Sequence, residues 1–187
     1  MASVIQSIAG EYRRYKALAE GALAQLNDSE ICAPAPGGGN SIATICWHIS
    51  GNLRSRFTEF LTSDGEKAWR NREEEFEARS VTKAELLEHW EQGWSVLFTT
   101  LEALDDPDLS RTVTIRGMAL GVDEALHRSL AHTSYHVGQV VYAARTLRGA
   151  AWRFLSIPPG QSAALDAAPG LQKPDAQATW VRRTTGA

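Results

Sequence analysis

The chain has 187 residues, of which 43% are hydrophobic and 22% charged, and its net charge is −3. These values are typical of one folded globular domain, and a slightly acidic chain without a basic stripe argues against a nucleic-acid partner. No apolar run approaches the roughly 20 residues of a membrane helix and the N-terminus lacks the order of a signal peptide, so we expect a soluble, cytoplasmic protein without a membrane partner.

Two helices are predicted in the first third of the chain, over residues 3–26 and 40–61. In the first, apolar residues recur at alternating steps of three and four, and in the second they form one apolar face. Both patterns are typical of a helix that packs on other helices. The proline- and glycine-rich stretch 33–39 between them indicates a loop, and Asn40 or Ser41 can cap the second helix. The apolar positions are Ile5, Ile8, Tyr12, Tyr15, Ala19, Ala22 and Leu26 in the first helix and Ile42, Ile45, Cys46, Ile49, Leu53, Phe57 and Phe60 in the second.

A third helix is predicted to begin after a charged loop at residues 62–80. Thr82 and Glu85 match a capping box, in which two backbone N–H groups are satisfied reciprocally. The segment 112–116 then alternates polar and apolar residues, which indicates a short strand that can pair with 118–120 about Gly117. The apolar stripe of the third helix consists of Leu86, Leu87, Trp90, Trp94, Leu97, Phe98 and Leu101.

A fourth helix is predicted over residues 122–147, with end signals at Arg145, Arg148 and Gly149. From residue 150 onward we expect an irregular extension, because Pro158-Pro159-Gly160 breaks any helix, and residues 164–187 look weakly ordered. Four long helices with little strand indicate an all-α four-helix bundle over residues 1–162, followed by a C-terminal tail over 163–187.

His132 and His136 lie four residues apart on the predicted fourth helix. They are separated by only about 40° around the helix axis, so both rings can reach one point. This spacing can bind zinc or a similar ion, since imidazole is a common ligand of such metals. The pattern alone is weak, however, and two hydrogen-bonded histidines at the edge of the core are the alternative interpretation.

His48 strengthens the metal hypothesis because it lies beside the apolar face of the second helix, on a narrower polar face. A small polar face next to a core face is typical of a helix that lines a cavity, although a plain solvent face is the alternative. The other members of this face are Ser41, Thr44, Asn52, Ser55 and Glu59. His89 lies among glutamates on the third helix, and we expect it to face water.

Two long runs of this chain resemble the DinB/YfiT-like superfamily, one over residues 40–57 and one over residues 130–142. Within that superfamily the chain is most similar to a branch described only as a domain of unknown function. The markers of that branch are found at 62–67, 114–117 and 152–162. The resemblance covers roughly Ile5 to Ser162.

The resemblance implies a four-helix bundle with up-down-down-up connectivity. It also implies a metal ion bound by one histidine of the second helix and two of the fourth, which are His48, His132 and His136 here. Some members of the superfamily resemble transferases or isomerases that use a low-molecular-weight thiol such as bacillithiol or mycothiol. Others are known as damage- or stress-induced proteins, so the resemblance does not decide whether this chain is catalytic.

Three histidine ligands leave a divalent ion, with zinc or nickel as the favoured candidates, one open coordination position. We expect Asn52 and Gln139 to line a possible pocket at that position, since each lies within one turn of a ligand. Arg54 and Arg56 could meet an anionic substrate, but a solvated helix face is the more common role of such residues. Tyr135 is more readily explained as a packing aromatic than as an acid.

Two classes of function follow. In one, the protein is a metal-dependent enzyme, a thiol S-transferase or a hydrolase that acts on a small molecule. In the other, it is a non-catalytic, stress-associated protein that binds a metal or ligand, and the ion ties two helices together.

A homodimer is also expected, because the first and third helices carry more large apolar residues than a small bundle needs, among them Tyr12, Tyr15, Trp90 and Trp94. Two-fold symmetric homodimers are the commonest assembly.

Overall fold

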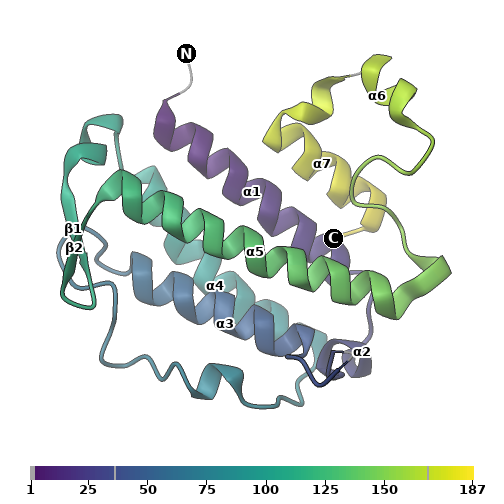
Figure 1. Cartoon of the computed structure of the whole chain (residues 1–187), viewed down its shortest axis with the longest axis horizontal. Helices are drawn as coiled ribbons and strands as arrows, with labels where there is room; N and C mark the ends of the chain where they lie inside the picture. The colour runs from purple at the N-terminus through teal and green to yellow at the C-terminus, as the bar shows by residue number, and fades with distance from the viewer. Residues whose placement is uncertain (1–2, 36, 168) are drawn as a thin grey trace.

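The computed structural model describes residues 3–35, 37–167 and 169–187, and it is mostly helical with one small two-stranded sheet. Four long helices hold the core: α1 (Val4–Leu23), α3 (Ile42–Phe57), α4 (Lys83–Glu102) and α5 (Val122–Arg148). They lie side by side, and contacts join them in the order α1, α5, α3, α4 and back to α1 (Figure 1). These are the four helices that the apolar periodicity predicts, each ending within a few residues of the expected position.

Side-chain caps determine where three of these helices begin. Ser3, Ser41 and Thr82 each accept a hydrogen bond from the backbone N–H three residues further on. Each bond satisfies one of the N–H groups that the first turn of a helix leaves without an intrahelical partner. The capping box predicted at Thr82 and Glu85 is confirmed, as is the cap at Ser41.

Large aromatic side chains fill the centre of the core. Tyr12, Trp90 and Trp94 are almost completely buried within the chain, and the Tyr12 ring meets Phe57 and Trp94 edge-on at centroid distances of 6.5 and 6.2 Å. The surplus of large apolar residues that suggested a dimer surface is therefore mostly the core of a single chain. Tyr15 packs half-buried against the same core.

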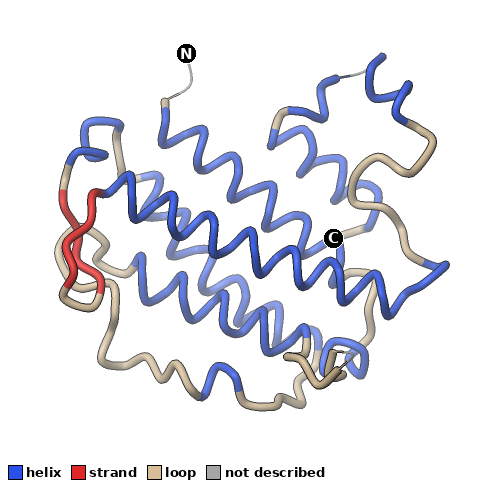
Figure 2. Tube along the Cα trace, in the orientation of Figure 1, coloured by secondary structure: helices blue, strands red, loops and turns tan. Residues whose placement is uncertain are grey.

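A β-hairpin closes one end of the helices, as the alternating pattern predicts (Figure 2). Strands β1 (Thr112–Ile115) and β2 (Met118–Gly121) pair antiparallel, with Ile115 opposite Met118. The two-residue turn between them has positive φ at both Arg116 (54°) and Gly117 (75°). A turn of this kind matches the twist of the strands but strains any residue other than glycine, asparagine or aspartate.

Several short helices complete the chain. Asn27, the residue after the first predicted helix, caps a further short helix with its side chain. These elements are α2 (Asp28–Cys32), η1 (Glu74–Phe76), η2 (Asp106–Ser110), η3 (Gly149–Ala151), α6 (Ser162–Ala167), η4 (Pro169–Gln172) and α7 (Pro174–Thr185). Among the described residues, no helix combines the length and apolar composition that crossing a membrane requires.

The C-terminal segment differs from the weakly ordered tail expected from the sequence. Helix α7 packs along α1, and Ala178, Val181 and Thr185 are buried there. Arg13 of α1 also pairs with Asp175 at 2.6 Å. This helix is hard to predict from the sequence because only three of its positions are buried. Three positions are too few to give a clear helical periodicity of apolar residues.

Helices α3 and α4 approach very closely at Gly93. A Cβ atom at this position would lie 2.7 Å from Ser50 Cα and 2.8 Å from Ser50 O, whereas a Cβ at Gly138 of α5 would meet nothing within 4 Å. Packing therefore requires glycine at position 93 but not at position 138.

We expect Gly93→Ala to destabilise the protein by about 1–3 kcal/mol, because the crowding cost exceeds the gain in helix propensity. Gly138→Ala, the matched control, should be neutral or stabilising by up to about 1 kcal/mol. Urea unfolding of both variants measures this difference. Equal stability of the two alanine variants would contradict the close approach of α3 and α4.

Candidate metal centre

Three histidines from two helices converge on one point. The ligand nitrogens of His48 on α3 and of His132 and His136 on α5 all lie within 4.8 Å of one another, and His48 Nε2 is 3.2 Å from His132 Nε2. His48 is almost fully buried, while the other two are half-buried. The predicted convergence of these side chains, which we call the histidine triad, is confirmed, and the group could hold a metal ion.

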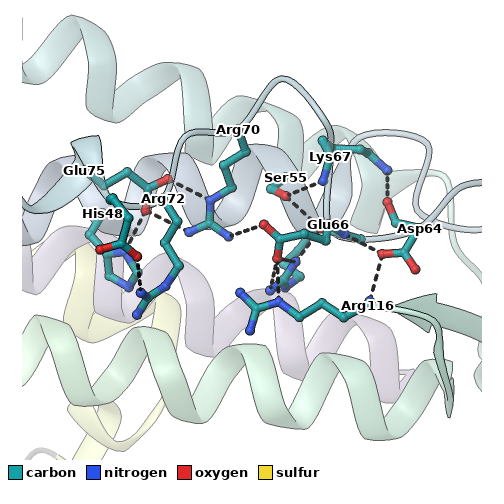
Figure 3. A network of polar contacts seen from close by, with 12 residues as sticks. His48, Ser55, Asp64, Glu66, Lys67, Arg70, Arg72, Glu75 and Arg116 are labelled. Atoms are coloured by element: carbon teal, nitrogen blue, oxygen red, sulfur yellow. Dashed lines mark hydrogen bonds and ion pairs between the residues drawn. The ribbon is translucent and has the colours of Figure 1, made fainter.

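A buried carboxylate orients His48. Glu75 Oε2 lies 2.8 Å from His48 Nδ1, and Arg70 donates to both oxygens of the same carboxylate at 2.7 and 2.8 Å (Figure 3). Burial raises the pKa of Glu75, but the hydrogen bonds from Arg70 and His48 outweigh it and hold the pKa below its usual value. An ionised carboxylate only accepts, so Nδ1 of His48 carries the proton and Nε2 presents its lone pair to the triad.

Gly51 makes room for this carboxylate on the surface of α3. A Cβ atom at residue 51 would lie 2.2 Å from Glu75 Oε1. Since Arg70 and His48 hold the carboxylate in place, any larger residue at position 51 would push it away from His48.

Gln139 orients His136 in a similar way. Its Oε1 atom accepts from Nδ1 of His136 at 2.7 Å, and its Nε2 donates to the Tyr135 hydroxyl at 3.3 Å. This bond leaves Nε2 of His136 free to face the triad. The sequence places Gln139 at the wall of a possible pocket, but its side chain contacts the His136 ring on the side away from the triad. Tyr135, which is expected to pack, is exposed.

The environment favours neutral imidazoles. Burial, followed by the neighbouring His136 and His48, lowers the pKa of His132 to about 3. Burial also lowers the pKa of His136. A metal ion binds the neutral form of histidine, so these two rings are in the required state at neutral pH.

The triad forms part of the wall of a cavity of about 380 Å³. Asn52, one turn after His48, lines this cavity as expected. Apolar side chains that include Phe57, Phe60 and Phe76 contribute another part of the wall. Five arginines also line it, which we call the cavity arginines: Arg56, Arg70, Arg72, Arg116 and Arg128.

Two carboxylates in the loop after α3 anchor the hairpin to this cavity. Asp64 accepts hydrogen bonds from the backbone N–H groups of Glu66, Arg116 and Gly117 at 2.7, 2.9 and 2.8 Å. These bonds hold the pKa of Asp64 below its usual value. Glu66 Oε2 accepts from Arg116 at 2.9 Å (Figure 3). The same oxygen accepts from Arg56 at 3.1 Å. These bonds hold the loop and the hairpin turn against the cavity that Arg56 and Arg116 line.

Several residues of the site were not identified from the sequence. Arg70 and Glu75 lie in an irregular loop whose path no periodicity reveals. The sequence could have indicated Arg128, because this residue precedes His132 by four positions and so lies on the same helix face. Arg56 proves to line the cavity rather than a solvated face, whereas Arg54 lies over the Trp69 ring.

His89 does not face water as expected. Its ring stacks on Trp47 at a centroid distance of 3.7 Å and an angle of 7°. Burial, with Arg54 as the next cause, lowers its pKa to about 4. His89 is separate from the triad and packs at the contact of α3 with α4.

We expect Glu75→Gln to weaken metal binding about 10–100-fold, because the outer hydrogen bond that orients a histidine ligand typically contributes this much to affinity. Glutamine keeps an acceptor for Arg70, so the loop should stay in place. Gly51→Ala should act in the same direction by displacing the carboxylate. Titration with zinc against a chromophoric chelator measures the affinity, with the exposed Glu73→Gln as control; equal affinities of the Glu75→Gln and Glu73→Gln variants would exclude this orienting role.

A family model described as "Protein of unknown function (DUF1572)" matches residues 2–161. Comparison with curated proteins and with solved structures gives no match. The matched region contains the histidine triad, Glu75 and all the cavity arginines, and helix α7 follows it. Since the match covers most of the sequence, the chain belongs to the DUF1572 family.

Proposed function

We propose that this protein binds one divalent metal ion, zinc or nickel, through Nε2 of His48, His132 and His136 in a DinB/YfiT-like four-helix bundle. The course of the chain supports the up-down-down-up connectivity of this bundle. Helices α3 and α4 run in the same direction, because the segment between them returns along the length of α3, and α1 and α5 run in the opposite direction (Figure 1).

The observation that carries the proposal is the geometry of the triad. Nitrogens at about 2.0–2.1 Å from a tetrahedral ion are about 3.3 Å apart, and His48 Nε2 and His132 Nε2 are separated by 3.2 Å. His136 lies at the cavity wall, and the ligand nitrogens of all three histidines lie within 4.8 Å of one another. Glu75 and Gln139 supply the outer hydrogen bonds that metal-binding histidines generally have.

An open coordination position favours an enzyme over a purely structural site. No fourth histidine, cysteine or carboxylate joins the triad in the part of the chain that the structure describes. Structural zinc sites are usually closed by four protein ligands, whereas catalytic sites keep one position for water or substrate. When bound, such an ion can lower the pKa of water to about 7 or hold a thiolate. We therefore infer a metal-dependent thiol S-transferase or hydrolase that acts on a small molecule in the cavity.

The alternative is a non-catalytic, stress-associated metal-binding protein. This alternative is supported by the position of the ligands on two different helices, since an ion bound by His48 on α3 and by His132 on α5 would join the two helices. A metal that binds only the folded state stabilises it by mass action.

We expect His48→Ala to lower the metal content of the purified protein sharply and to reduce the increase in melting temperature on adding zinc, because two histidine ligands bind the ion more weakly than three. His127→Ala is the matched control, since His127 is an exposed histidine of α5 outside the triad. Elemental analysis and thermal unfolding provide the two readouts. Full metal occupancy in His48→Ala would rule out the triad as the binding site.

A thiol should bind at the open position if the enzyme class is correct. Imidazole ligands carry no charge, so the site retains the positive charge of the ion and favours an anionic ligand. We expect a saturable sulfur-to-metal charge-transfer band when the cobalt-loaded protein is titrated with a small thiol. The absence of any spectral change at millimolar thiol would favour the non-catalytic class.

A further inference from the structure

We propose that the cavity beside the histidine triad binds a small organic acid, whose apolar body lies against the phenylalanines and whose carboxylate or phosphate group is held by Arg70 and Arg128. This acid would be the substrate of the proposed metal site, so its role in catalysis rests on the proposed function. The binding of the acid itself depends only on the cavity.

The charge of the cavity wall is the first observation. Five arginines line the cavity, and none of its lining residues is an aspartate or glutamate. Behind the wall, Glu66 pairs with Arg56 and Arg116, and Glu75 pairs with Arg70. Arg72 has only the highly exposed Glu73, and Arg128 has no ion pair among the described residues. Positive charge thus exceeds negative charge around a space with low-dielectric walls, which concentrates anions.

Arg70 supplies the second observation. Its side chain is 2% exposed, and its Nη1 atom is buried without a hydrogen-bond partner. The nearest carboxylate oxygen to Nη1 is Oε1 of Glu66, at 3.9 Å, which is beyond hydrogen-bonding distance. Native proteins rarely leave a buried charged donor unsatisfied, because the penalty is large. An acidic group in the cavity would provide the missing acceptor.

Arg128 gives the ligand an orientation relative to the triad. It precedes His132 by one helical turn and His136 by two, and all three residues line the same cavity. Because one turn advances about 5.4 Å, an acid group at Arg128 lies about one turn along α5 from the metal ligands. A small molecule anchored there can extend another part of its structure to the triad.

The strained hairpin turn is consistent with this role. Arg116 has a positive φ of 54°, and both its backbone N–H and its guanidinium are held by carboxylates of the preceding loop, Asp64 and Glu66. Backbone strain of this kind is enriched at functional sites, where the surrounding structure maintains it. Here the strain places an arginine at the cavity in a turn position that ordinarily takes asparagine or glycine.

The size and lining of the cavity limit the ligand to a small molecule. Its volume of about 380 Å³ lies near the lower end of the range for small-molecule pockets. Phe57, Phe60 and Phe76 provide an apolar surface that a simple inorganic ion would not contact. An aromatic or aliphatic acid matches both parts of the lining.

The test is calorimetric titration of the metal-free and the zinc-loaded full chain with phenylacetate, with phenyl phosphate and with phenylacetamide, a neutral isostere of phenylacetate. We expect at least one of the acids to bind with a stoichiometry of one, and the amide to bind at least tenfold more weakly. Comparison of the two acids shows which acidic group is preferred. Arg128→Gln should weaken acid binding about tenfold or more, since it removes a charged donor.

Arg183→Gln is the control, because Arg183 is an exposed arginine of α7 away from the cavity and the substitution changes the net charge equally. Its affinity for the acids should stay within twofold of the unsubstituted protein. Equal losses in Arg128→Gln and Arg183→Gln, equal binding of acid and amide, or no binding of either acid would each overturn the proposal. The proposal would also be overturned if acid binding required zinc and had the same affinity in Arg128→Gln as in the unsubstituted protein, since the acid would then be a ligand of the metal alone. Acid binding in a chain that takes up no zinc would refute the proposed metal function and leave this inference intact.

Discussion

The rest of the site depends on the hydrogen bonds that the buried carboxylate of Glu75 makes with Arg70 and His48. This carboxylate joins the loop to α3, because it accepts from Arg70 within the loop and contacts His48 on α3. It fits against α3 only where Gly51 leaves space. Removing one partner of a buried ion pair typically costs about 3–5 kcal/mol, since the other charge is left uncompensated. The position of the loop and the orientation of the first histidine therefore depend on one another.

This arrangement separates two electrostatic requirements within one cavity. The triad needs neutral rings, and burial provides that by lowering the pKa values of His132 and His136. The charged side chains of the wall are all arginines, and the carboxylates of Glu66 and Glu75 pair with three of them without lining the cavity. If the proposed metal ion is bound, a ligand would meet arginines on one side and an electrophilic centre on the other, without an acidic side chain that repels it.

The sequence predicts the features that depend on neighbouring residues. Helix caps at Ser41 and Thr82, the apolar stripes and the hairpin about Gly117 each follow from a local pattern, and His132 and His136 face the same way because of helix geometry. The residue pattern assigns His48 to a polar face, but only the family resemblance groups it with His132 and His136, because the pairing of α3 with α5 depends on tertiary packing.

Other features could not be predicted because they depend on long-range contacts of irregular segments. Arg70 and Glu75 lie in a loop that has no period, so nothing in the sequence indicates that it returns along α3. The environment of His89 depends on Trp47 of a different helix, and the order of α7 depends on its packing on α1. In each case the local pattern indicates exposure, and tertiary contact determines the outcome.

X-ray absorption spectroscopy of the zinc-loaded protein identifies the ligands of the proposed metal site. We expect three imidazole nitrogens at about 2.0–2.1 Å and one further oxygen or nitrogen ligand that a small molecule can replace. A spectrum with a sulfur ligand from Cys32 or Cys46, or with fewer than three imidazoles, would contradict a site formed by His48, His132 and His136.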